Sequence, residues 1–600
     1  MKLKVTGPVF VVVGVGLLAL GFFVSRFLED AAPYSNIHPE DYVGPAACGE
    51  CHEKNYESWK DHSHRKMNLT ASEESVLGDF SGVELQYGRG HARFHRDGMD
   101  FVMSIFEDGR MTRRHKVTRT VGSLYMQYYV GTQVFGPEPR THPTYKLESK
   151  LPFAYLFPTK SWVPEVYLDS TSEPDELYLN GKLADYIYDE PPVHNWNTTC
   201  MTCHNTYPYI VRLWHLPPPY DADGLWQGGF PESDISLDGP TLHQGSLDLG
   251  SGVRATHADE LVTVGISCES CHFGGREHAI NGREIRFVPT APEVTLTNSH
   301  GAVKSDRKDP YVVNSICRQC HNSELLLHPN QASAINSDEA MDMSRGACST
   351  QIKCTDCHNP HRRGPGSGAP DQPHHIAACL GCHEKYKDPA ASVAHSGHPA
   401  SSQVSCLDCH MPRFVAGLDT VTRTHKISSP NDESMLSAGG PNACNLCHLD
   451  QPITWTLEQL EKGWKRPLPA SALSVAHYGE DLALKVGLAW LSSKNRFFRL
   501  AATEAYARSS LVEDPIPFLL HGLKDAYAFN RTFALLSLQR LLDRKVEDEE
   551  YRLVGPVELR EKQVAKLERS GALSTELRQS RESEGRTDGG APPAAVGEGD

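Results

Sequence analysis

Apolar and polar positions in the first third of the chain fall into short strand-like runs separated by turn residues. The runs Met99–Phe106 and Met111–Val121 each follow an Asp-Gly pair, at 97–98 and 108–109. An Asp-Gly pair between two such runs is a strong signal for a tight hairpin, because both residues accept the backbone angles of the turn. The pattern therefore predicts a small antiparallel β-meander within a β-rich insertion over about residues 80–190.

The N-terminus shows a different pattern, a continuous apolar run from about Pro8 to Val24 after Lys2 and Lys4. A basic start followed by such a run is typical of a secretory signal or of a single membrane anchor. Because no small-residue cleavage site follows directly, we predict an uncleaved transmembrane helix within residues 1–28. The two lysines would then lie on the cytoplasmic side.

Residues 453–573 have the apolar spacing of helices, and two of their segments resemble each other. Arg499-Leu-Ala-Ala502 and Arg531-Thr-Phe-Ala534 lie 32 residues apart, a spacing similar to that of HEAT-type helical repeats. A HEAT-like domain that binds a protein partner and a plain helical cap both fit this pattern. The composition of residues 574–600, rich in Ser, Glu, Gly, Ala and Pro, predicts a disordered tail.

Composition changes this picture, because apolar residues are scarce while cysteine and histidine are abundant. Hydrophobic residues make up 39% of the 600, alongside 17 cysteines and 30 histidines. A chain of this length with few apolar residues needs another source of core volume. The formal net charge of −16 makes nucleic acid an improbable partner and favours other proteins.

Eight copies of Cys-x-x-Cys-His supply a candidate for the missing core, since this pattern attaches c-type haem. Two cysteines three residues apart lie on one helical turn and can bond both vinyl groups of a porphyrin, and the adjacent histidine reaches the iron. The predicted cofactor is haem c, eight copies covalently attached within a domain over residues 43–450. The motifs are Cys48-x-x-Cys51-His52, Cys200-x-x-Cys203-His204, Cys268-x-x-Cys271-His272, Cys317-x-x-Cys320-His321, Cys354-x-x-Cys357-His358, Cys379-x-x-Cys382-His383, Cys406-x-x-Cys409-His410 and Cys444-x-x-Cys447-His448.

Zinc is the main alternative for paired cysteines. Zinc ribbons do not need a histidine directly after every second cysteine, whereas all eight motifs here have one. Met411 cannot reach the far face of the ring that His410 would bind, so we assign it a structural role. The seventeenth cysteine, Cys348, has no predicted role. Because haem attachment to this motif takes place outside the cytoplasm, the predicted location is the inner membrane, with the bulk of the chain on the periplasmic side.

The opening segment Val43-Gly-Pro-Ala-Ala-Cys48 through His64, with Tyr56 and Trp59, resembles the cytochrome c-554-like multihaem family. That family belongs to one superfamily with hydroxylamine oxidoreductase and the multihaem nitrite reductases. The resemblance implies a mostly α and irregular multihaem cytochrome c fold, to which the patterns above add the small β-meander, the HEAT-like helical C-terminal domain and one N-terminal transmembrane helix. We expect the aromatic residues of 122–162 to pack around the first haems rather than to form a substrate pocket.

A second histidine on each iron would keep the potential low. The resemblance implies six distal ligands: His64, His278, His361, His395, His398 and His425. Five further histidines are weaker candidates that surface or core hydrogen bonding explains equally well: His115, His194, His300, His328 and His375. His477 and His521 lie in the helical segment and are not expected to bind iron.

Two functions fit these residues. The first is an electron carrier in a respiratory or extracellular electron-transfer chain, whose partners are a quinol-oxidising complex or other cytochromes. The second is an oxidoreductase acting on a small nitrogen or sulfur oxide, such as nitrite or hydroxylamine, at one haem with an open site. The nitrite reductases mark their catalytic haem with Cys-x-x-Cys-Lys, which this sequence lacks, and no residue can be assigned as catalytic. The carrier is therefore favoured.

Overall fold

The computed structural model describes residues 34–87, 90–170, 195–197, 200–214, 233–237, 258–292, 294–298, 301–302, 306–322, 326–362 and 373–583. The chain divides into two compact units. Unit 1 comprises residues 1–56, 206–263 and 267–307, and unit 2 comprises residues 57–205, 264–266 and 308–600. Both units contain attachment motifs.

Unit 1 is built from short elements. Its helices are η1 (Pro39–Asp41), α2 (Pro45–Gly49), α7 (Tyr209–Trp214), η4 (Ala258–Glu260), α8 (Glu269–His272) and α9 (Arg276–Asn281), and α3 (Glu53–Lys60) leads into unit 2. A three-stranded antiparallel sheet joins β10 (Ser233–Leu237), β11 (Val294–Asn298) and β12 (Gly301–Ala302). None of the residues of α2, α3 or α9 is buried, so packing between side chains contributes little to holding these helices.

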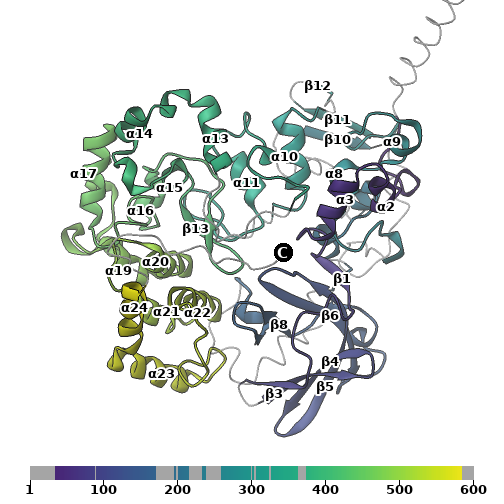
Figure 1. The fold of residues 1–600 in the computed structure, drawn as a ribbon, viewed down its shortest axis with the longest axis horizontal. Coiled ribbons are helices and arrows are strands. Elements are labelled where there is room, and N and C mark those ends of the chain that lie inside the picture. Colours follow the sequence, from purple (N-terminus) through teal and green to yellow (C-terminus); the bar gives the residue numbers. More distant parts are fainter. Residues whose placement is uncertain are drawn as a thin grey trace, which may run out of the picture. The chain divides into compact units, whose positions relative to one another are not determined.

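Unit 2 begins with a nine-stranded antiparallel sheet. Its main path runs in the order β2-β3-β4-β5-β6-β8-β9, with β1 beside β5 and β7 beside β6 (Figure 1). The strands are β1 (Asn68–Thr70), β2 (Val83–Tyr87), β3 (Gly90–Asp97), β4 (Asp100–Glu107), β5 (Arg110–Val121), β6 (Met126–Phe135), β7 (Ser149–Lys150), β8 (Phe153–Leu156) and β9 (Ser161–Pro164). Two short 3-10 helices, η2 (Pro143–Tyr145) and η3 (Glu165–Tyr167), flank its last strands.

In unit 2 the eighth motif, Cys444–His448, lies in turns, whereas the other five motifs lie in or next to short helices of the region 201–437. These are α6 (Met201–His204), α10 (Pro310–Arg318), α11 (Glu339–Ser344), α12 (Cys354–Cys357), α13 (Pro373–Cys382), η5 (Glu384–Lys387), α14 (Pro389–Ser396), η6 (Ala400–Ser402), α15 (Cys406–His410) and α16 (Glu433–Ser437). A two-stranded hairpin of β13 (Arg413–Ala416) and β14 (Val421–Arg423) follows α15.

The rest of unit 2 is helical through residue 583. Its elements are α17 (Ile453–Trp464), η7 (Ala470–Ala472), α18 (Val475–Tyr478), η8 (Glu480–Leu482), α19 (Val486–Leu491), α20 (Arg496–Arg508), α21 (Ile516–Gly522), α22 (Ala528–Leu542), α23 (Val557–Ser570) and α24 (Ala572–Ser583). The segments predicted to resemble each other fall in α20 and α22, which pack together. Helix α24 lies largely in the predicted tail, of which residues 584–600 are outside the described residues.

The predicted fold class is wrong about the size of the β-structure. Strands make up 16% of the chain beside 41% helix, so the sheet is a main element rather than a small meander. The aromatic residues expected around the first haems belong to strands β6, β8 and β9 and build the core of this sheet. In that core the rings of Phe94 and Trp162 stack 3.7 Å apart, and Phe80 meets Trp162 edge-on.

The sheet and the C-terminal helices share one hydrophobic cluster. Met126, Ala154 and Leu156 of the sheet pack in it with residues of α21 and α22, including Leu519 and Leu538. The hydroxyl of Thr532 on α22 also donates to the Tyr167 carbonyl at 3.2 Å. Two segments more than 350 residues apart in the chain therefore build one core, which local sequence patterns do not reveal.

The predicted inner-membrane location also requires correction. Within the residues that the structure describes, we find no helix with the length and apolar character needed to span a membrane. The predicted anchor, residues 1–28, lies outside the described residues.

Candidate functional site

The attachment motifs are held as single helical turns. In seven of them the backbone N–H of the histidine donates to the carbonyl of the first cysteine, at 2.9–3.2 Å. These histidines are His52, His204, His272, His321, His358, His383 and His448, and His410 ends helix α15. All 17 cysteines lie within the described residues, and none of them forms a disulfide. The two thiols of each motif therefore sit one turn apart, the geometry that attachment to a porphyrin requires.

Four motifs of unit 2, the fourth to the seventh, follow one another in space as they do in sequence. Helix α10 packs on α12, α12 on α13, and α13 on α15. The side chain of Asn314 joins the first two helices, because its amide donates to the Ile352 carbonyl and its oxygen accepts from the Cys354 N–H, both at 2.9 Å. The motifs from Cys317 to His410 thus form a row, which the eighth motif continues because Cys444 lies close to Cys409 and His448 faces His398.

Cysteines of successive motifs in this row are near enough to affect each other's pKa. Hydrogen bonding to Cys317 raises the pKa of the Cys354 thiol. Burial raises the pKa of Cys409 to about 12, with a smaller contribution from Cys444 of the next motif. Burial likewise raises the pKa of Cys379, and nearby Cys406 adds to it. These mutual effects on the pKa indicate that successive motifs lie close together along the row.

In unit 1 the first and third motifs are also adjacent. Hydrogen bonding to Cys268 raises the pKa of Cys48. The buried carboxylate of Glu269, inside the third motif, accepts the backbone N–H groups of Val43 at 3.0 Å and Gly44 at 2.8 Å, just before α2. It also accepts the Gly275 N–H at 2.9 Å, where α9 begins. One carboxylate therefore positions both motifs and the helix that carries His278, a role that the motif pattern alone did not reveal.

Four of the six predicted distal histidines face a motif histidine. The ring centroids are 6.2 Å apart for His278 and His52, 6.1 Å for His395 and His410, 6.4 Å for His398 and His448, and 6.3 Å for His425 and His358. The angles between ring planes are 18°, 7°, 32° and 31° in the same order. Each pair lies within one unit.

These separations can be compared with the size of a metal site. An imidazole nitrogen lies about 2 Å from a bound metal and about 1 Å from its own ring centre, so two imidazoles on opposite faces of one iron have centres about 6 Å apart. The four observed distances have this value. The residues present therefore fit a haem iron held between two histidines.

Hydrogen bonds to the other ring nitrogen orient several of these imidazoles. The Nδ1 atoms of His278, His398 and His410 face backbone carbonyls of Arg283, Ser396 and Ser428 at 2.8, 2.8 and 2.9 Å. A carbonyl accepts only from a protonated nitrogen, so Nδ1 carries the hydrogen and Nε2 keeps its lone pair for a metal. Burial, together with His425 and His375, lowers the pKa of His358 to about 4, which keeps that ring neutral as well.

His64 and His361, the other two predicted distal histidines, lie elsewhere. Burial lowers the pKa of His64 to about 4, with smaller contributions from His62 and His321, so His64 lies in the neighbourhood of the fourth motif. His361 is exposed just after α12, where its backbone N–H donates to Asn359 at 3.0 Å.

The five weaker candidate histidines differ in their surroundings. His115 is buried in strand β5, and His328 packs against the ring of Phe498 at 5.8 Å. His375 lies 6.0 Å from His358 with ring planes at 54°, so two histidines compete for the fifth motif. His375 precedes Cys379 by one helical turn on α13, a spacing that could have indicated it. His194 and His300 lie outside the described residues, and His477 and His521 are exposed.

The motif histidine His321 has a carboxylate partner. Its Nδ1 lies 2.7 Å from Oε2 of Glu339, the first residue of α11. Burial alone would lower the pKa of His321, but the hydrogen bond and charge of Glu339 outweigh it and raise that pKa to about 9. No sequence motif pointed to Glu339.

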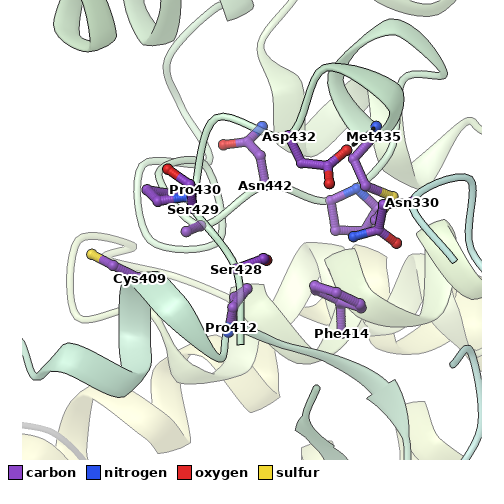
Figure 2. A pocket seen from close by; sticks show the side chains of 12 residues that line it. Asn330, Cys409, Pro412, Phe414, Ser428, Ser429, Pro430, Asp432, Met435 and Asn442 are labelled. Atoms are coloured by element: carbon purple, nitrogen blue, oxygen red, sulfur yellow. Dashed lines mark hydrogen bonds between the residues drawn. The ribbon is translucent and has the colours of Figure 1, made fainter. Parts of the chain in front are cut away.

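Figure 2 shows a small hollow beside the seventh motif, lined among others by Cys409, Phe414, Ser428 and Asp432. Its free space is about 20 Å³, which is roughly what one water molecule needs. The hollow is therefore too small for a substrate, and it lies directly beside the side chain of Cys409.

Comparisons with known proteins point to one class of protein. The family model of cytochrome c552 matches residues 385–464, and that of cytochrome c554 and c-prime matches residues 47–82. A curated relative, Multiheme cytochrome MtrA of Shewanella baltica (strain OS185), is 26% identical over 214 residues, which are 35% of this chain and 51% of the relative. The chain thus spans about half the length of that relative.

Among solved structures, that of Outer Cell Wall Cytochrome OcwA aligns with 83% of this chain and 99% of its own. The sequence identity is 15% and the TM-score 0.36, a similarity too distant to support statements about this fold.

Proposed function

Since the chain is a multihaem cytochrome c with covalently bound haem, we propose that it carries electrons along eight such haems. The observation that carries this proposal is the row of adjacent motifs, in which His358, His410 and His448 each face a second imidazole about 6 Å away. Haem supplies one-electron chemistry at its iron, and the axial ligands and their hydrogen bonds set its potential.

The cysteines of the eight motifs attach the haems, and each motif histidine binds one iron. The distal ligands that we propose from ring geometry are His278 opposite His52, His425 opposite His358, His395 opposite His410 and His398 opposite His448. His64 stays a sequence-based candidate, which the resemblance of residues 43–64 supports. His361 likewise stays a sequence-based candidate.

Paired imidazoles favour a carrier over an enzyme. An iron with histidine on both faces has no open position for a substrate, whereas an oxidoreductase acting on a small nitrogen or sulfur oxide needs one. The partners that we propose are other redox proteins, such as cytochromes of a respiratory or extracellular electron-transfer chain. The C-terminal helices are a candidate surface for a protein partner.

Haem counting and spin-state measurement test this function. Pyridine haemochrome analysis and intact mass of the full chain should give eight haems, and low-temperature EPR of the oxidised protein should show low-spin iron. Fewer than eight haems would contradict the motif assignment. A high-spin, five-coordinate signal from about one haem in eight would favour the oxidoreductase.

The matched variants His395→Ala and His477→Ala test the ligand pairing itself. His395 faces His410, while His477 is an exposed residue of α18. The first should convert one haem to high spin and the second none. Low-spin spectra for both variants would overturn the proposed pairing.

A further inference from the structure

The hydrogen-bond partner of His321 differs in kind from those of three other proposed ligands. His278, His398 and His410 donate to neutral backbone carbonyls, whereas His321 faces the Glu339 carboxylate at 2.7 Å. A hydrogen bond to a charged acceptor is about twice as strong as one to a neutral acceptor and draws the proton further from the donor. The ring of His321 therefore has more imidazolate character than those of the other three histidines.

The position of this carboxylate is tightly constrained. Its second oxygen, Oε1, accepts the backbone N–H of Ser337 at 3.0 Å. Ser337 has φ +71°, a conformation that costs a non-glycine residue energy and tends to persist at functional sites. Helix α11 itself is anchored by Ala340, Met341, Asp342 and Met343, all of them buried.

The same short helix also reaches the fifth motif. Asp342 accepts the Ser333 N–H at 2.7 Å and the Thr424 hydroxyl at 3.0 Å, and Thr424 immediately precedes His425. His425 in turn faces His358. Helix α11 thus connects to a proposed ligand of the fourth motif through Glu339 and to the segment carrying a ligand of the fifth through Asp342.

We infer that Glu339 is a positioning residue that makes the haem at Cys317, Cys320 and His321 the lowest in potential of the row, so that it is reduced last. A more anionic axial ligand stabilises ferric over ferrous iron, and a partly buried negative charge near the iron acts in the same direction. The reaction concerned is the gain of one electron by the iron, with no bond formed or broken. This inference rests on the proposed attachment of a haem at the fourth motif.

The test is a spectroelectrochemical redox titration of the full haem-loaded chain as wild type and as Glu339→Gln. Glutamine keeps the shape and an oxygen acceptor but removes the charge. We expect the component of lowest potential to move to higher potential in the variant while the rest of the titration is unchanged. Glu339→Asp, which keeps the charge on a shorter side chain, should give an intermediate shift.

The matched control is Glu384→Gln. Glu384 directly follows His383 of the sixth motif, but it is 73% exposed and pairs with Lys387 at 3.1 Å. Water and salt screen such a charge, so removing it should leave the titration unchanged. An equal shift in this control would attribute the effect to charge near any haem and would overturn the inference.

The remaining outcomes separate this inference from the proposed function. If Glu339→Gln keeps eight haems and titrates as wild type does, Glu339 does not set the potential, and the carrier function stands. If that variant loses a haem, Glu339 acts in assembly and the inference also fails. If peptide mapping finds no haem on Cys317 and Cys320 of the wild type, the proposed octahaem function itself fails.

Discussion

Helices α13 and α22 are held in place in opposite ways. Helix α22 buries 13 of its 15 residues among the C-terminal helices and against η3, next to the sheet, whereas α13, which carries the sixth motif, buries none of its ten. Burial of apolar surface stabilises α22 by roughly 25 cal/mol for each Å² removed from water. Helix α13 has no comparable burial, so we expect its stability to come mainly from the haem that we propose its cysteines attach.

This contrast explains how a chain with few hydrophobic residues can fold. The apolar side chains are concentrated in the sheet and the C-terminal helices, where they form conventional cores. The motif region is instead rich in cysteines, histidines and turn residues. A cofactor face is a large apolar surface, and short helices can pack around it without a core of their own.

The largest expected effect comes from removing one haem. In the double variant Cys379→Ser and Cys382→Ser, the amides of α13 should exchange much faster than in the wild type, because none of the residues of this helix is buried. Amides of α22 should keep their protection. Hydrogen–deuterium exchange with mass spectrometry measures both, and retained protection in α13 would contradict the comparison.

A smaller effect, on the unfolding free energy of the protein, is expected from a substitution in the core of the sheet. Phe94 is fully buried and stacks on Trp162, so Phe94→Ala should cost about 3–5 kcal/mol of unfolding free energy through lost contacts and a cavity. Thermal unfolding followed by far-ultraviolet circular dichroism measures it. The exposed Met99 is the control, and Met99→Ala should change stability by less than about 0.5 kcal/mol. Loss of haem in Phe94→Ala would show that the two regions are not independent.

Stability between pH 4 and 6 depends on the buried Asp342. Burial raises the pKa of Asp342 to about 6, and nearby Asp338 adds to this, although hydrogen bonds from Ser333 and Thr424 oppose it. A carboxyl whose folded-state pKa is raised stabilises the fold while protonated, and this contribution is lost as the pH rises through about 6.

Wild type should therefore lose stability relative to Asp342→Asn as the pH rises from 4 to 7, by on the order of 2–3 kcal/mol. The difference in unfolding free energy between the two proteins, measured across this pH range, tests the prediction. Asp548→Asn, at a largely exposed position, should show no such difference. A pH-independent difference for Asp342→Asn would contradict the assignment.

The smallest change in stability is expected at the fifth motif. The signal there is the most specific one, because it is the spin state of a single haem. Both His425 and His375 approach His358, at 6.3 and 6.0 Å between ring centroids, and the family resemblance favours His425. His425→Ala should therefore give one high-spin haem by EPR, and His375→Ala should leave the spectrum low-spin. The reverse result would exchange the two assignments.

Sequence patterns predicted covalently bound haem c, which the family comparisons support, but they predicted the sheet poorly. A motif such as Cys354-Thr-Asp-Cys357-His358 needs only one helical turn, so its spacing alone specifies the local geometry that the structure shows. The pairing of β6 with β5 and β8 is non-local, and the same aromatic residues can pack on a cofactor or on a sheet. Local pattern therefore did not distinguish the two, and the predicted fold class was wrong there.

The sequence by itself determined where cofactors can attach, because the two thiols and the imidazole of each motif are neighbours in the chain. It also supplied the histidines that face His52, His358, His410 and His448, through resemblance to a family rather than through spacing. Only the tertiary structure decided which motifs are adjacent, and which partners orient each ring. The carboxylate of Glu339 is 18 residues from His321 and belongs to another helix, so its contact exists only once α10 and α11 pack together.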